Sequence, residues 1–469
     1  MCWRGARPDA SARGTGRGVI DAQNRHNAWV STFTGVFAAR AVSSLATLAG
    51  IMLMGRHLGP AHYGNLVVLL TLSKVGAELA GPAIDTGVVR FAAMHWPGPG
   101  EAGLRYLRAG FWAKAVLAVL LLAAGVFLAG PVRQAVYGPV DGAQVPLYAV
   151  RLAFLAAALT VSWAFTQACF QARHRFGKYA LSEMLAALTR LGFVGGTVLA
   201  ARWAQWPLTQ SVVLFLGAYA LGTGIATLYG AAQFPRGLLE RPATAWAVAG
   251  ELFRFTKWVL LACCFTSVAH RLDILLVKAL GLAQQAVGDY AAAVQLVLLG
   301  DLVILTLFNV LLPKASGLRT RGDMAAFLRG FRFPALLASV AMVPVVLGSG
   351  WIARIAFGSE FIQTGSFFGI LLIGALFSLG CAPAGTALYA MGKSHVVALF
   401  EGAKLACIAG LGWWAAHTYG AEGMAWTMTA VKSTIGILTV VAAHWAARGM
   451  PISVDGGAMG SQDEGGRHA

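Results

Sequence analysis

Charge is scarce in this chain of 469 residues, because Asp, Glu, Lys and Arg together make up only 12% of it. A soluble domain usually carries about 25% charged and about 45–50% apolar residues. Here 58% of the residues are hydrophobic and the mean hydropathy is +0.67. A water-soluble fold of this length cannot bury so much apolar side chain. The composition therefore excludes an ordinary soluble protein and indicates a protein of the lipid bilayer.

Acidic residues are the scarcest of the charged types, with 19 Asp and Glu against 36 Lys and Arg, which gives a net charge of +17. A basic excess of this size is often typical of nucleic-acid binding. In this chain the low total charge and the long apolar runs argue against that partner. We therefore expect no nucleic acid to bind.

Catalytic and metal-binding motifs are also missing. The sequence contains no Walker A, GxSxG or HExxH pattern, and no segment outside the apolar runs is long enough for a soluble catalytic domain. The six cysteines form no CxxC pair and have no His partner at metal-ligand spacing, and five of them lie inside apolar runs. These absences predict a protein that is not an enzyme and needs no cofactor.

Apolar segments of membrane-spanning length dominate what is present. A bilayer core of about 30 Å needs about 20 mostly apolar residues per helix. The sequence predicts an all-α polytopic membrane protein with about twelve transmembrane helices, at residues 29–55, 63–84, 108–130, 146–170, 179–201, 210–233, 256–280, 288–312, 331–356, 362–390, 394–418 and 422–447.

The basic residues predict the orientation of these spans, because short cytoplasmic loops are enriched in Lys and Arg. With the N-terminus inside, 23 of the 36 basic residues fall in cytoplasmic segments, 5 fall in outside loops and eight lie in the spans. This separation places both termini in the cytoplasm, for a protein of the cell inner membrane. We expect disordered cytoplasmic tails at 1–27, which is basic, and at 448–469.

Two weak echoes indicate an internal duplication. The turn after the first span contains Leu58-Gly59, and the turn after the seventh contains Leu280-Gly281. Further along each half, Gly177-Lys178 is echoed by Gly392-Lys393. Repeats of this kind are common in transporters. We expect two six-helix lobes, 28–234 and 256–447, around a central cavity, joined by an interfacial linker at 235–255.

Charged residues within the spans are candidates for function, since each costs about 2.5–3.5 kcal/mol to insert. Two of the eight basic ones, Lys114 and Arg151, lie near span ends, where their side chains are expected to reach toward water. The other six lie deeper and are the candidate cations of a substrate-binding cavity: Arg40, Lys74, Arg190, Arg271, Lys404 and Lys432.

Some of these cations have carboxylates at helical spacing. Lys74 precedes Glu78 by four residues, and Glu401 precedes Lys404 by three, so each pair is expected to share one helix face. Arg40 and Arg271 have no carboxylate at such spacing. Because their spans are counterparts in the duplication, we expect the two guanidiniums to face each other across the cavity and to bind an anion, ideally a phosphate. A purely structural role is the alternative.

Acidic residues in the spans are candidates for ion or proton coupling, and they are Glu78, Asp85, Asp273 and Asp301. Glu78 and Asp85 flank Gly81-Pro82, which is expected to interrupt the second span. Carboxylates beside a broken helix can relay protons in a transporter. Helix-end capping and ion pairing are equally compatible with these positions.

Several segments together resemble a known family. They are MGRHLGPAHYGNLVVLL, RLDILLVKALGLAQQAVGDYAAAVQL, FGSEF, ALYAMGKSH and YGAEGMAWTMTA. In this order they resemble the polysaccharide flippases of the multidrug/oligosaccharidyl-lipid/polysaccharide exporter superfamily, over nearly the whole chain. The resemblance implies two six-helix lobes around a cavity that opens alternately to each side of the membrane.

The resemblance also implies a function. Members of the family move undecaprenyl-diphosphate-linked oligosaccharides from the cytoplasmic to the outer leaflet for O-antigen, capsule or exopolysaccharide assembly, beside polymerases and glycosyltransferases of the same pathway. Arg40, Lys74 and Arg271 fall where cavity cations of such flippases are expected. There are three alternatives to this function: a multidrug or cation antiporter of the same superfamily, a polytopic sugar-lipid polymerase or ligase, and a lipid II flippase. A lipid II flippase is expected to have additional helices beyond twelve.

Overall fold

The computed structural model describes residues 17–79, 81–95, 102–235, 237–239, 245–298, 315, 318, 320–330, 337, 339–340 and 342–450. Within these residues every regular element is a helix. The candidate coupling residue Asp301 lies outside them, as do 1–16 and 451–469 of the expected tails.

The first two predicted spans form a single helix, α1 (Arg17–Leu79), which is bent at Gly59 where φ is 65°. Its apolar part, Ala38–Leu79, has 42 residues. A straight helix of that length would extend about 63 Å, twice the hydrocarbon core. The bend therefore separates two crossings. The helix begins at Arg17, so the expectation of disorder is wrong for residues 17–27, which continue the first span as a helix.

The predicted break at Gly81-Pro82 is confirmed. Helix α2 (Pro82–Met94) starts there with Pro82 in its first turn, a position where the missing N–H of proline costs nothing. The rest of the first half consists of α3 (Ala102–Phe127), α4 (Ala129–Gln144, bent at Gly138), α5 (Leu147–Ala172), α6 (Phe176–Ala204) and α7 (Leu208–Ala231).

The second half starts with α8 (Ala245–Ala269) and α9 (Leu272–Ala279). Short helices follow at α11 (Arg321–Gly330), α13 (Val343–Leu347) and α14 (Ser349–Phe357). The chain ends in α15 (Thr364–Ala390), α16 (Ser394–Cys407), the π-helical turn η2 (Ile408–Gly412) and α17 (Trp413–Arg448), which is bent at Gly420. Parts of the predicted spans 288–312 and 331–356 lie outside the described residues.

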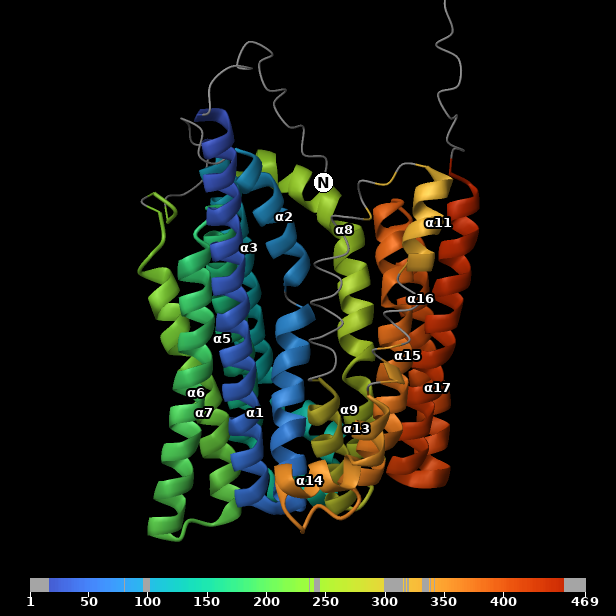
Figure 1. The fold of residues 1–469 in the computed structure, drawn as a ribbon. Coiled ribbons are helices and arrows are strands. Elements are labelled where there is room, and N and C mark those ends of the chain that lie inside the picture. Colours follow the sequence, from blue (N-terminus) through green and yellow to red (C-terminus); the bar gives the residue numbers. More distant parts are fainter. Residues whose placement is uncertain are drawn as a thin grey trace, which may run out of the picture.

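Within the described part of the chain, seven helical stretches are long and apolar enough to cross a membrane. Two of them, Ala38–Leu79 and His395–Arg448, are each divided by a bend. The start of α1 and the end of α17 lie at the same end of the bundle (Figure 1), as an even number of crossings requires. Below, this is called the terminal end, and the opposite end, where α14 lies across the bundle, is called the distal end.

Backbone conformation repeats between the two halves. Residues with positive φ occur in the same order in each half. The pairs are Gly59 with Gly281, Gly138 with Gly358, His174 with Gly392, and Gln205 with Gly420. The first pair agrees with the predicted echo at Leu-Gly. The second echo was out of register, because Gly392 matches the turn residue His174, whereas Gly177 already lies within α6.

The packing of apolar side chains differs between the two ends. At the distal end one buried cluster includes residues of both halves, among them Leu66, Tyr63, Phe357 and Tyr290. Toward the terminal end the described residues form two further clusters. One lies around Phe91 and also includes Leu252 at the start of α8, and the other lies around Leu388 in the second half. In this conformation the halves are joined at the distal end.

Candidate functional site

An ion pair joins the two halves at the centre of the protein. The Arg271 guanidinium, between α8 and α9, binds the carboxylate of Glu78 in the last turns of α1 at 2.9 Å. The Arg271 side chain is only 14% exposed. Lys74 stays within electrostatic range of Glu78 on the same helix, but the salt bridge of Glu78 is made with Arg271 of the second half.

Lys74 and Arg190 line a cavity of about 60 Å³ between α1, α6 and α7, together with Tyr63, Tyr219 and Gln295. Pockets that hold small ligands usually have a volume of about 300–1,000 Å³. In this conformation the cavity is too small for a sugar, and the substrate of a transporter would enter only after the halves move apart.

The Arg190 guanidinium is held in place without a carboxylate. It donates hydrogen bonds to the Thr223 hydroxyl at 2.9 and 3.2 Å. The same guanidinium lies 4.4 Å from the centre of the Tyr219 ring and 5.4 Å from that of Trp163. Aromatic faces stabilise a cation without neutralising it. Arg190 therefore keeps its full positive charge beside the cavity.

Lys74 connects these groups, because it lies within electrostatic range of Arg190, Arg271 and Glu78. Among the described residues no carboxylate lies within 4.0 Å of the Lys74 ammonium or the Arg190 guanidinium. Three cations thus share the single carboxylate of Glu78. Such an arrangement in a low-dielectric interior favours the binding of an anion.

A second polar group extends from Arg271 into the second half. Lys404 pairs with Glu401 at 2.5 Å, as the sequence predicts, and lies 3.4 Å from the Nε2 atom of His270. His270, Asp273 and Lys432 line a smaller cavity of about 30 Å³. His270 is also within electrostatic range of Arg271. The polar group of the second half therefore adjoins the central group around Arg271.

The candidate coupling residue Asp273 is buried, and its carboxylate already has hydrogen-bond partners. Its carboxylate accepts hydrogen bonds from the Tyr290 hydroxyl at 2.9 Å and from the Ile274 backbone N–H at 2.8 Å. Its exposed fraction is 1%. These contacts fix the start of α9 to the helical segment 284–298, which contains Tyr290.

Arg40 lies apart from the central cations. It donates a hydrogen bond of 2.8 Å to the Tyr179 hydroxyl and pairs with Glu183 at 3.6 Å, both on α6. The expectation that Arg40 and Arg271 face each other without carboxylate partners is therefore wrong in this conformation. The partner of Arg40 lies on a different helix, where spacing along its own helix could not reveal it.

Asp85 forms a buried ion pair beside the broken helix. The Lys114 ammonium binds Asp85 at 2.8 Å and donates to the Gly81 carbonyl oxygen at 2.8 Å. The expectation that Lys114 reaches toward water is wrong, because the Lys114 side chain is only 3% exposed. Helix α3 already begins at Ala102, which places Lys114 well inside the helix. Arg151, by contrast, is exposed, as expected.

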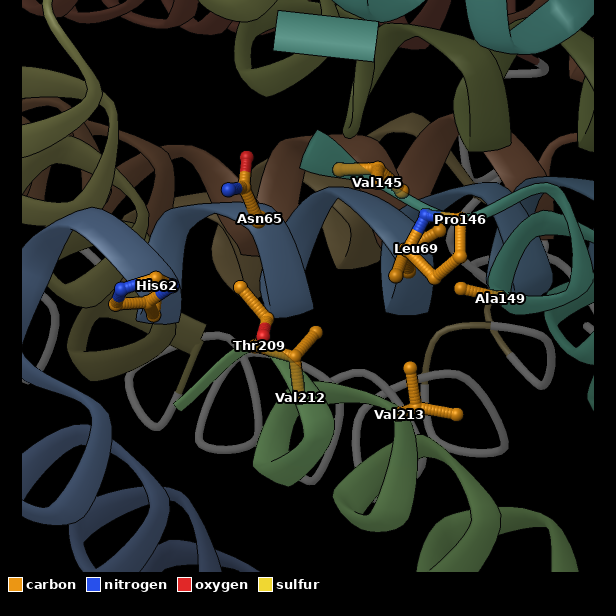
Figure 2. A pocket seen from close by; sticks show the side chains of 9 residues that line it. All are labelled: His62, Asn65, Leu69, Val145, Pro146, Ala149, Thr209, Val212 and Val213. Atoms are coloured by element: carbon orange, nitrogen blue, oxygen red, sulfur yellow. The ribbon is translucent and has the colours of Figure 1, made fainter. Parts of the chain in front are cut away.

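The first half is tightly packed near its distal end. His62 and Asn65 of α1 approach Thr209 of α7 and Pro146 around a cavity of about 10 Å³ (Figure 2). A cavity of this size holds at most one water molecule. It cannot serve as a substrate site in this conformation.

Several residues of the central group are absent from the predicted set. They are Tyr219, Thr223, Trp163, His270 and Gln295. Their sequence signal is weak. Tyr219 and Thr223 stand four apart on one helix face, and His270 adjoins Arg271, but uncharged polar residues are common in membrane helices.

The sequence profile of a family described as "Polysaccharide biosynthesis protein" matches residues 33–318 of the chain. No curated protein sequence matches the chain. Solved structures do. An inward-facing multidrug resistance MATE family transporter of the MOP superfamily aligns with a TM-score of 0.71 and 12% identity, over 87% of this chain and 94% of that one.

The lipid II flippase MurJ in an inward closed conformation aligns with a TM-score of 0.68 and 12% identity, over 87% of this chain and 86% of that one. A MOP superfamily transporter from Pyrococcus furiosus, described as having a binding pocket of reverse polarity, aligns with a TM-score of 0.61 and 12% identity, over 88% of this chain and 94% of that one. At such identities the likeness establishes the fold. The chain thus belongs to the polysaccharide biosynthesis protein family, and it has the two-lobe all-α fold of the MOP exporter superfamily.

Proposed function

We propose that this protein is an alternating-access flippase for undecaprenyl-diphosphate-linked oligosaccharides. It moves the repeat unit from the cytoplasmic to the outer leaflet of the inner membrane, for O-antigen, capsule or exopolysaccharide assembly. Glycosyltransferases supply the lipid-linked unit and a polymerase consumes it.

The observation that carries this proposal is the group of three cations, Lys74, Arg190 and Arg271, with one carboxylate between them. A diphosphate has the charge and the acceptor oxygens that two guanidiniums and an ammonium favour. A lipid-linked sugar can place its diphosphate between the halves while its polyprenyl chain stays in the bilayer. Lys432 extends the positive region into the second half, where Lys404 is paired with Glu401.

The same charges argue against an antiporter of cationic drugs, the main alternative. A cation entering the central cavity would meet Lys74 and Arg190. Like charges at such distances repel strongly where water is scarce. The fold is shared with MATE transporters, but the charge of this cavity favours an anionic substrate.

Among the predicted coupling carboxylates, Glu78 is the best placed to couple transport to an ion gradient. Its side chain is 31% exposed, whereas Asp273 is tied to Tyr290 and Asp85 to Lys114. Water can therefore reach Glu78 more readily than the other two.

The proposal can be tested by surface polysaccharide output in cells that depend on this protein. Lys74→Gln and Arg190→Gln are each expected to lower output at least tenfold at matched protein level, the effect of about 1.4 kcal/mol on substrate binding. Arg151→Gln is the matched control, since it removes an exposed cation of a span. Normal output from the Lys74→Gln, Arg190→Gln double variant would contradict the proposal.

A further inference from the structure

The Glu78–Arg271 ion pair has features of a contact that must open during transport. It joins α1 of the first half to the start of α9 in the second half. It lies beside Lys74, one helical turn before Glu78, and so at the edge of the central cavity.

The Arg271 guanidinium is incompletely satisfied by Glu78. Its terminal NH2 group binds the carboxylate, while its buried Nε has no hydrogen-bond partner among the described residues. A buried donor without a partner is costly. The structure therefore leaves Arg271 with an unused donor next to two further cations.

From this arrangement we infer that Glu78 occupies the position of the substrate's anionic group. In the empty protein its carboxylate binds Arg271 and offsets part of the repulsion among the three cations. When a phosphate group of the substrate arrives, it displaces Glu78, binds Arg271, Lys74 and Arg190, and opens the link between the halves. This inference rests on the proposed function. It adds that the Glu78 carboxylate competes with the substrate for Arg271.

Competition of this kind serves transport. A bare site of three cations would hold a diphosphate tightly in one conformation and would slow its release, because a ligand that favours one state strongly traps the protein there. Glu78 returns to Arg271 as the substrate leaves. The carboxylate thus lowers affinity and makes binding reversible.

Affinity of the purified full-length protein for a soluble isoprenyl diphosphate, farnesyl diphosphate, tests the inference by calorimetry. Glu78→Gln is expected to bind the probe about 5- to 20-fold more tightly than wild type, the range of a typical coupling between two sites. Glu183→Gln is the matched control, because Glu183 pairs with Arg40 within the first half. Its affinity should stay within about twofold of wild type.

A double-mutant cycle shows whether the gain acts through Arg271. In an Arg271→Gln background, Glu78→Gln should raise affinity by less than about twofold, because the contested guanidinium is gone. Glu78→Asp keeps the charge but shortens the side chain, and it should give a gain between wild type and Glu78→Gln. It replaces Glu78→Gln in the test if that variant does not fold.

The outcomes are separable from those of the proposed function. If wild type binds farnesyl diphosphate and the Glu78 variants bind it equally or more weakly, Glu78 is only a structural partner and the inference is overturned. If wild type binds neither farnesyl diphosphate nor inorganic diphosphate, the proposed function fails and the inference falls with it.

Discussion

The Arg56 Nε donates a hydrogen bond of 3.1 Å to the Ala356 carbonyl oxygen and so joins the first half to the second at the distal end. Its guanidinium also binds the neighbouring carbonyl of Ile355. Both carbonyls belong to the last turn of α14, where helices leave backbone acceptors without partners and carry partial negative charge. Arg56 thus stabilises the distal closure by capping a helix of the opposite half.

Replacing this cap should loosen the distal end. Arg56→Gln is expected to weaken the closed conformation by about 1–2 kcal/mol, through the loss of charge-assisted hydrogen bonds to the helix end. Spin labels at Trp203 and Ile362, which are 91% and 76% exposed, should then report a longer or broader distance distribution. The exposed Arg202 lies at the same end, and Arg202→Gln should leave the distribution unchanged. An unchanged distance distribution for Arg56→Gln would show that Arg56 does not stabilise the closed distal end.

Backbone contact at the distal end requires glycine at two positions. A Cβ added at Gly64 would lie only 2.9 Å from the Gly288 backbone nitrogen. A Cβ added at Gly288 would overlap the Pro60 carbonyl group. Gly288→Ala should therefore force the halves apart and reduce transport severely, although the residue is small. Gly217→Ala is the control, because nothing lies within 4 Å of a Cβ at that helical position. Normal transport by Gly288→Ala would show that this close approach is dispensable.

The buried pair of Lys114 and Asp85 predicts a stability effect that depends on which partner is removed. Lys114→Met leaves Asp85 buried without its cation and should lower the free energy of unfolding by about 3–5 kcal/mol. The double variant Lys114→Met, Asp85→Leu removes both charges and should lose less than Lys114→Met alone. Reversible unfolding in detergent measures these values. A loss in the double variant equal to the sum of the losses in Lys114→Met and Asp85→Leu would mean that the pair is not coupled.

The spans and their breaks could be read from the sequence because hydropathy and glycine act locally. The bend at Gly59 and the break at Gly81-Pro82 follow from residues that disfavour a continuous helix where they stand. The local pair Glu401–Lys404 was equally predictable, since three residues along a helix bring side chains to one face.

The partners of the other charges could not be predicted, because they depend on how each helix is rotated and packed. Arg40 binds Glu183, and Arg271 binds Glu78, over long separations in the chain. The burial of Lys114 depends on the fold in the same way, because α3 begins at Ala102, before the apolar run, and this start sets the depth of Lys114. Pairing across helices is a property of the tertiary fold.

The two arginines that the sequence groups together should differ in function. Arg271→Gln is expected to weaken farnesyl diphosphate binding by about tenfold or more, because it removes one of three central cations. Arg40→Gln should change the same affinity by less than about twofold, because Arg40 is half-exposed and paired within the first half. Titration of both purified variants measures the difference. Equal losses would place Arg40 at the substrate after all.

Transport by the purified protein in proteoliposomes tests the central claim most directly. The substrate is a fluorescent undecaprenyl-diphosphate oligosaccharide, and its movement between leaflets is followed by quenching from outside. The account predicts protein-dependent exchange of this lipid that is lost in the Lys74→Gln, Arg190→Gln double variant and kept in Arg151→Gln. Protein-dependent transport of a quaternary ammonium compound, with no movement of the diphosphate lipid, would contradict it.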